Sequence, residues 1–138
     1  MKQASHTVVA VAPGPGLLDI TAPIADLLAT SGIREGLVTC FIRHTSASLL
    51  IQENADPDVL RDLADAYDRL APRGASYRHD TEGPDDMPAH IRSALSAASL
   101  SIPVEKGEPA LGTWQAIYLF EHRDRRHTRE IVLHLMGE

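Results

Sequence analysis

The sequence predicts an α+β fold in which two or three helices pack on a large mixed, mostly antiparallel β-sheet. Three observations support this prediction. Apolar runs of strand length recur along the chain, two or three segments show apolar residues spaced three and four apart, and proline and glycine separate the segments. With 138 residues and a mass of 15.0 kDa, the chain is long enough for one hydrophobic core, so we expect a single domain over residues 1–138.

The first elements are predicted from alternating side chains and from the prolines and glycines that interrupt them. Residues 5–12 alternate as a strand does, residues 13–16 (Pro-Gly-Pro-Gly) break it, and residues 17–20 can form a short second strand. We expect a helix to begin at Thr21, whose hydroxyl would cap it, and to end near Gly32. Its inner face would carry Ile24, Leu27 and Leu28.

The middle of the chain predicts two strands and the clearest helix. Apolar runs at 37–42 and 49–51 flank a polar segment. Asp56 is placed as an N-cap and Pro57 in the first turn of the helix that follows. The inner face of that helix would carry Leu60, Leu63, Tyr67 and Leu70.

The remaining elements come after a polar loop at 77–88. The run from 111 to 122 is apolar on both faces, so we expect that strand to be covered on both sides. We expect, in order, a helix over 88–98 with Ile91, Ala94, Leu95 and Ala98 inside, an edge strand at 100–104, a hairpin turn at 105–108, the covered strand, and a final strand at 129–136.

Charge and hydropathy exclude some functions. A formal charge of −6 and a pI of about 5.6 argue against a nucleic-acid-binding surface. No apolar run approaches 18 residues, so we expect no membrane span. The single cysteine, Cys40, lies in an apolar run and cannot form a disulfide within the chain, which indicates a cytoplasmic protein.

Polar residues gather between Arg43 and Pro57. His44, Thr45 and Ser46 follow one apolar run, and Asn54 and Asp56 follow the next. An imidazole, two hydroxyls, an amide and a carboxylate in one short segment indicate a binding site. The alternative is structural: Asp56 as a helix cap, which we favour as its single role, and Thr45 and Ser46 as turn residues.

Four histidines, His44, His79, His90 and His122, stand at expected element ends, where functional side chains concentrate. Imidazoles bind divalent metals and act as general bases near neutral pH. The chain has no His-Glu-x-x-His or Cys-x-x-Cys motif, so the fold would have to assemble a metal site. Four carboxylates form an acidic loop: Asp80, Glu82, Asp85 and Asp86. Loops of this kind are usually only solvated, but this one could also hold Mg²⁺.

Arginines cluster late in the chain, where they could form an exposed charged turn or a clamp for phosphate. The members are Arg123, Arg125, Arg126 and Arg129.

Six separated motifs, in order, resemble the secondary thiamine-phosphate synthase family. They are His44-Thr-Ser-Ala-Ser-Leu49, Glu53-Asn-Ala-Asp-Pro57, Tyr77-Arg-His-Asp80, Glu82-Gly-Pro-Asp-Asp-Met-Pro-Ala-His90, Leu111-Gly-Thr-Trp-Gln115 and Glu121-His-Arg123. The chain departs from that family at Ala116, at Arg126 and across residues 96–99.

The resemblance implies a homotrimer that joins hydroxymethylpyrimidine diphosphate and thiazole phosphate with release of pyrophosphate, a transferase of thiamine biosynthesis acting on small phosphorylated metabolites. It implies a divalent metal, Mg²⁺ or Zn²⁺, with His44, His79 and His90 as ligands or proton carriers, and Arg123 and Arg129 on phosphate. Carried over position by position, its polar signature falls on His44, Thr45, Ser46, Asn54, Asp56, His79, Asp80, His90, Gln115, Glu121, His122, Arg123 and Arg129.

Two alternatives to the transferase stand beside it. One is a metal-dependent enzyme of another class, such as a hydrolase, that uses the same histidines. The other is a ligand-binding trimer without catalysis, in which the polar motifs serve caps and subunit contacts.

Overall fold

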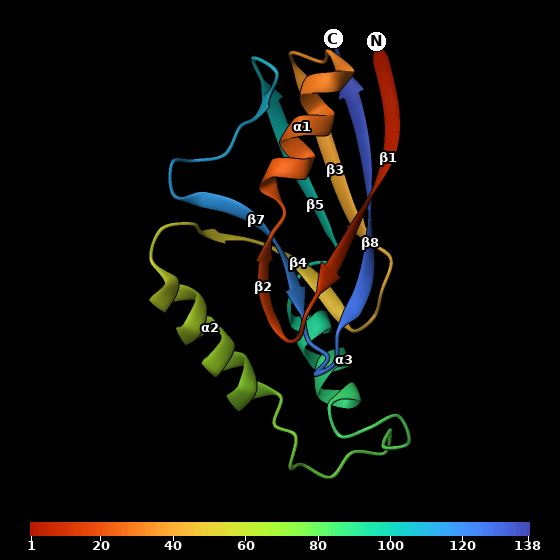
Figure 1. Ribbon diagram of the computed structural model, residues 1–138, viewed down its shortest axis with the longest axis vertical. Helices are drawn as coiled ribbons and strands as arrows, with labels where there is room; N and C mark the ends of the chain where they lie inside the picture. Colours follow the sequence, from red (N-terminus) through yellow and green to blue (C-terminus); the bar gives the residue numbers. More distant parts are fainter.

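The computed structural model describes residues 1–138 and contains two antiparallel sheets and three helices (Figure 1). The α+β class is confirmed, but the predicted single large sheet is divided in two, and every strand pair is antiparallel. The larger sheet has the order β1 (Lys2–Ala12), β8 (His127–Gly137), β3 (Gly36–Ile42), β5 (Ser99–Glu105) and β6 (Glu108–Pro109). The smaller sheet has the order β2 (Gly16–Asp19), β7 (Gln115–Glu121) and β4 (Ala47–Glu53), and the helices are α1 (Thr21–Ser31), α2 (Pro57–Leu70) and α3 (Asp86–Leu95).

One hydrophobic core of 19 buried residues joins the larger sheet to α1 and the smaller sheet. The strands of the larger sheet alternate buried and exposed positions, so only one of its faces meets the core. Ile24 and Leu28 of α1 are buried in this core, as predicted. None of the helices is both long and apolar enough to span a membrane.

Strand β7 is covered on both faces, as the sequence predicts. Ile117 and Leu119 lie in the core, while Phe120 on the opposite face contacts Tyr67 of α2 with ring centroids 5.0 Å apart. Because β7 is enclosed, the residues at its carboxyl end, Glu121 and His122, are also buried.

Helix α2 begins as predicted, and its inner face is less buried than predicted. Asp56 Oδ1 accepts a hydrogen bond from the backbone N–H of Asp58 at 2.9 Å, and Pro57 occupies the first turn. The helix projects from the body of the molecule (Figure 1), and none of its residues is fully buried. Leu70, expected on the inner face, is 63% exposed because it lies at the end farthest from the helix start, beyond the Tyr67 contact.

The cap of α1 differs from the prediction. The Thr21 hydroxyl accepts from the backbone N–H of Ile117 at 2.9 Å and so ties the helix to β7 instead of capping it. Asp19 Oδ1 accepts from the Thr21 N–H. The helix ends as predicted at Gly32, whose φ of 74° favours glycine.

Helix α3 turns a different face inward from the one that apolar spacing predicts. It begins at Asp86, and Leu95 is 53% exposed. The buried side chains instead include Asp86 and Arg92, which are stable there because they have partners. Arg92 Nη2 donates to the Ala71 carbonyl at 3.1 Å and lies 2.9 Å from Asp68 Oδ1.

The pairing of β4 with β7 separates two groups of polar residues. Ala47 lies opposite Glu121 at one end of the pair, and Glu53 lies opposite Gln115 at the other. Six residues of strand correspond to roughly 20 Å. The predicted site residues therefore divide between the two ends of the smaller sheet.

Candidate functional site

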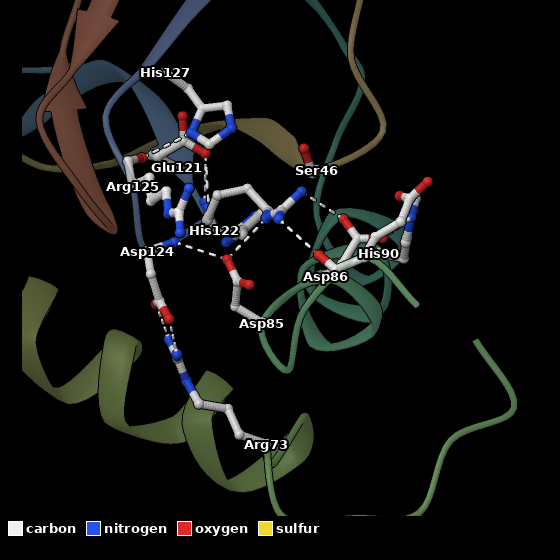
Figure 2. Close-up of polar contacts among 12 residues, drawn as sticks. Ser46, Arg73, Asp85, Asp86, His90, Glu121, His122, Asp124, Arg125 and His127 are labelled. Atoms are coloured by element: carbon white, nitrogen blue, oxygen red, sulfur yellow. Dashed lines mark hydrogen bonds and ion pairs between the residues drawn. The ribbon is translucent and has the colours of Figure 1, made fainter. Parts of the chain in front are cut away.

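A charged cluster lies where β7 ends, β8 begins and α3 begins (Figure 2). Its centre is the carboxylate of Glu121, which is buried and paired with the buried guanidinium of Arg129. Arg129 Nε donates to Glu121 Oε1 at 2.6 Å, and Glu121 Oε2 also accepts the backbone N–H groups of His122 (2.9 Å) and Arg123 (3.2 Å). Glu121 thus fixes the direction in which the chain leaves β7.

Arg123 joins this strand end to the start of α3. Its Nε donates to Asp85 Oδ2 at 2.8 Å, its Nη1 to Asp86 Oδ1 at 2.7 Å, and its Nη2 to the Glu82 carbonyl at 3.2 Å. All three nitrogens of the guanidinium therefore have protein acceptors. Arg123 was expected to bind phosphate. In the structure its guanidinium instead binds the carboxylates of Asp85 and Asp86.

Asp85 connects the cluster to the arginine loop. Burial alone would raise the pKa of Asp85, but hydrogen bonds from Arg123 and from the backbone N–H of Asp124 outweigh it and lower this pKa to about 2. Figure 2 shows Asp124 between Asp85 and Arg73. The Asp124 carboxylate forms an ion pair with Arg73. Asp85 is therefore an ionised structural anchor at neutral pH.

His79, Asp86 and His90 form a candidate metal centre. Asp86 Oδ2 lies 2.6 Å from His79 Nε2 and 3.2 Å from His90 Nε2, and one ligand atom from each residue lies within 4.8 Å of the others. The two imidazole rings meet edge to face, with centroids 5.4 Å apart. The loop before α3 supplies His79, while Asp86 and His90 stand one helical turn apart on α3.

The electrostatics of the centre suit a cation. Burial would raise the pKa of Asp86, but the hydrogen bond from His79 and the charge of Arg123 outweigh it and lower this pKa. The residue offers an ionised carboxylate that is only 3% exposed, whereas His90 is half-buried and His79 is exposed. Two imidazole nitrogens and one carboxylate oxygen match the ligand sets of zinc and other transition-metal sites that keep an open position.

His44, the third expected ligand, lies apart from this centre. Its Nε2 accepts the backbone N–H of Glu130 at 2.9 Å, and its Nδ1 lies 3.4 Å from Arg129 Nη1. Burial, followed by the charge of Arg129, lowers the pKa of His44. Ser46 Oγ accepts from Arg129 Nη2 at 3.0 Å, and the exposed Thr45 lines the same hollow as His44.

His122 belongs to the interior. It is 1% exposed, its Nε2 lies 2.9 Å from the buried Ser48 hydroxyl, and its ring packs on Phe120 with centroids 4.4 Å apart. Burial, then the charges of Arg92 and Arg129, lower the pKa of His122 to about 3. The ring is therefore neutral at physiological pH.

The remaining predicted residues lie at the other end of the smaller sheet or in solvent. Asn54 Nδ2 donates to the carbonyls of Thr113 (3.0 Å) and Gln115 (3.3 Å), which holds the segment before β7. Asp56 caps α2, and Gln115 Oε1 accepts from the Gly112 N–H at 2.7 Å. Asn54, Asp56 and Gln115 thus perform structural roles away from the charged cluster.

Asp80 is exposed, and Asp86 is the carboxylate that contacts both imidazoles. The sequence placed Asp86 in an acidic loop that is usually solvated but could hold Mg²⁺, and did not place it beside the histidines. The spacing Asp86-x-x-x-His90 was the available signal, because residues four apart share a helix face. It was missed because the helix was expected to begin at residue 88.

Comparisons with known proteins agree with one another. A family model described as "YjbQ: UPF0047 protein YjbQ-like" matches residues 6–138. A UPF0047 protein of Synechocystis sp. is 51% identical over 99% of this chain and 94% of its own length, and UPF0047 protein YjbQ of Salmonella typhimurium is 44% identical over 86% and 87%.

Solved structures show the same fold. A conserved hypothetical protein of Thermus thermophilus superposes with a TM-score of 0.85 at 34% identity, covering 95% of this chain and 99% of that one. A YjbQ-like protein of unknown function from Sulfolobus solfataricus gives 0.88 at 24% identity, covering 99% and 100%, a likeness of fold alone.

These findings correct the family expected from the motifs. The matching family and its relatives carry YjbQ or UPF0047 names, and none of them refers to a thiamine-phosphate synthase. The prediction of a transferase in thiamine biosynthesis is therefore wrong. The names of the matching family and of these relatives state no reaction.

Proposed function

The chain belongs to the YjbQ-like UPF0047 family, and from this premise we propose that it is a metal-binding protein whose His79, Asp86 and His90 hold a divalent ion. One observation carries the proposal: two imidazole nitrogens converge on a single oxygen of a buried carboxylate. Such a carboxylate is favoured inside a protein when it is paired with cations.

The ligand chemistry favours Zn²⁺ or a similar transition metal over Mg²⁺. Imidazole nitrogens suit Zn²⁺, Cu²⁺, Fe²⁺ and Ni²⁺, whereas Mg²⁺ prefers a shell of oxygen ligands and retained water. Three protein ligands leave at least one position for water or for an oxygen atom of a small ligand. The exposed side of the centre, where His79 meets solvent, gives access to that position.

The hydrogen bonds around Asp86 support the proposal. The Asp86 carboxylate uses Oδ2 for the two imidazoles and Oδ1 for Arg123, so the ligand oxygen is held in one orientation. Carboxylate ligands in metal centres are commonly oriented by such outer hydrogen bonds. Arg123 also reduces the negative charge of the centre, which favours a ligand that brings its own charge to the metal.

Isothermal titration of chelator-treated protein with Zn²⁺, Mn²⁺ and Mg²⁺ tests the proposal. We expect one Zn²⁺ per chain, with Mn²⁺ weaker and Mg²⁺ much weaker. His79→Ala, Asp86→Asn and His90→Ala should each weaken binding at least tenfold. His134→Ala, which removes an imidazole bonded to Ser5 and Gln3, is the matched control and should change nothing. Equal losses in the control, or no stoichiometric binding, would reject the centre.

A second proposal concerns assembly: copies of the chain associate through the outer face of the larger sheet, with a homotrimer as the expected state. No core residue lies on that face, and its exposed large apolar side chains support the proposal; they are Val9 (61%), Val11 (41%) and Phe41 (48%). Apolar patches of this kind are typical of protein interfaces.

We also propose a cytoplasmic location. The single cysteine, Cys40, is free and buried, and burial raises the pKa of its thiol to about 11. A free thiol is compatible with a reducing compartment.

A further inference from the structure

A second hollow, apart from the candidate metal centre, lies where the segment between β3 and β4 meets the start of β8. Its volume of about 630 Å³ lies in the size range of small-ligand pockets, and its polar lining comes from Arg43, His44, Thr45, Ser46 and Arg129. None of these residues is among the three candidate metal ligands. A ligand of this hollow is therefore separate from the metal ion.

The protonation of His44 follows from its hydrogen bonds. The backbone N–H of Glu130 donates to His44 Nε2 at 2.9 Å, so Nε2 must carry a lone pair. A neutral imidazole has one N–H, and the proton therefore resides on Nδ1. His44 Nδ1–H is thus a donor.

Another donor lies close to His44 Nδ1–H. Arg129 Nη1 lies 3.4 Å from His44 Nδ1, and a guanidinium nitrogen cannot accept a hydrogen bond. The other two nitrogens of Arg129 are engaged, since Nε donates to Glu121 and Nη2 donates to Glu121 and Ser46. Nη1 is the free corner of a guanidinium whose residue is only 4% exposed. Two donors therefore converge with no protein acceptor between them.

Hydroxyl groups add to the donor set. Ser46 Oγ accepts from Arg129 Nη2, which leaves its own O–H free to donate, and the exposed Thr45 lines the same hollow. The formal charges of Arg129 and Arg43 are balanced by Glu121 and Glu130. Donors in a nearly neutral setting suit one small oxyanion group better than a polyanion.

We propose that this hollow binds an oxyanion group of a small metabolite, a carboxylate or a phosphate, with one oxygen accepting from both Arg129 Nη1 and His44 Nδ1. A guanidinium N–H held in a fixed position, beside a neutral imidazole N–H donor, is well suited to bind a charged oxygen atom. It requires no metal, so it stands or fails independently of the centre formed by His79, Asp86 and His90.

Nuclear magnetic resonance of metal-free protein carrying ¹⁵N-labelled histidine tests the inference. Inorganic phosphate and acetate are titrated separately against sodium chloride at matched ionic strength. We expect a saturable shift of the His44 Nδ1 resonance with at least one of the two anions and none with chloride. A response to phosphate alone identifies a phosphate group as the natural ligand, and a response to acetate of equal or greater strength identifies a carboxylate.

Variants locate the binding. Titration calorimetry gives the affinity of each variant for the responding anion, because His44→Phe removes the reporting resonance. His44→Phe should lower this affinity about tenfold or more, because it removes one of the two convergent donors. Ser46→Ala should lower it by a smaller factor and provides a second reading if His44→Phe does not fold. Arg61→Ala removes a positive charge from an exposed position on α2, which controls for net charge alone, and should leave the affinity within about twofold. Absence of a saturable shift with either anion, or an equal loss in Arg61→Ala, overturns the proposal.

Discussion

Arg123 and Asp86 form an ion pair of 2.7 Å in which the arginine holds one carboxylate oxygen while the other oxygen faces two imidazoles. The pair comes from the end of β7 and the first turn of α3. It makes the position of a candidate metal ligand depend on a strand that is buried on both faces.

The first prediction concerns this dependence. Arg123→Gln should weaken Zn²⁺ binding about 10- to 100-fold, because it frees the Asp86 carboxylate to rotate away from the imidazoles. Titration calorimetry measures the change. Arg78→Gln removes the same charge from an exposed position beside His79 and should have little effect. If both variants bind Zn²⁺ like the unchanged protein, Arg123 does not orient Asp86.

The second prediction concerns the buried pair of Glu121 and Arg129. Glu121→Ala leaves a buried guanidinium without its main partner, and we expect the free energy of unfolding to fall by about 3 to 5 kcal/mol. Urea denaturation measures it. Glu130→Ala breaks the exposed pair with Arg43 and should cost less than about 1 kcal/mol. Similar losses in the two variants would contradict the burial that distinguishes the pairs.

The third prediction concerns acid stability. In the folded protein the pKa of His122 is about 3, against 6.5 for an ordinary histidine. Between these values the unfolded chain binds a proton that the folded chain does not, so stability falls as the pH drops below about 6.5. The contribution of this residue is up to about 1.4 kcal/mol per pH unit.

His122→Gln keeps an acceptor for Ser48 and cannot be protonated in this range. The variant should therefore show a shallower loss of stability than the unchanged protein between about pH 6 and pH 3, measured by urea denaturation at a series of pH values. Parallel pH profiles for the two proteins would show that His122 is not a buried neutral group.

The fourth prediction concerns assembly. Sedimentation analysis should give a mass of three times 15.0 kDa. Glutamates at Val9 and Val11 would place charge on the exposed apolar face and should yield monomers. Leu95→Glu changes an equally exposed residue on α3 and should leave the mass unchanged. A monomeric unchanged protein would reject this interface.

Local patterns predicted much of the fold. Alternation located β1, the two-sided apolar run located β7, and the Asp56–Pro57 pair located the start of α2. Such signals depend on residues that are neighbours in sequence, so they can be recognised without knowledge of the fold.

The site could be predicted only in part, because it depends on buried charges. His79 and His90 were expected together, and the structure brings them together. Asp86 was assigned to an acidic loop that is usually solvated but could hold Mg²⁺, and no role was predicted for Arg92, because charged residues are rarely buried unless they are paired. Their partners come from other elements, Arg123 at the end of β7 and Asp68 on α2, and no local pattern reveals such pairing.

The central claim is that His79, Asp86 and His90 hold one divalent ion. Crystals of the protein grown with Zn²⁺ and measured on both sides of the zinc absorption edge test it most directly. We expect one anomalous peak per chain, between the two imidazole Nε2 atoms and Asp86 Oδ2, that is lost in Asp86→Asn crystals. A peak elsewhere, or none at this position with Zn²⁺ in excess, would contradict the account.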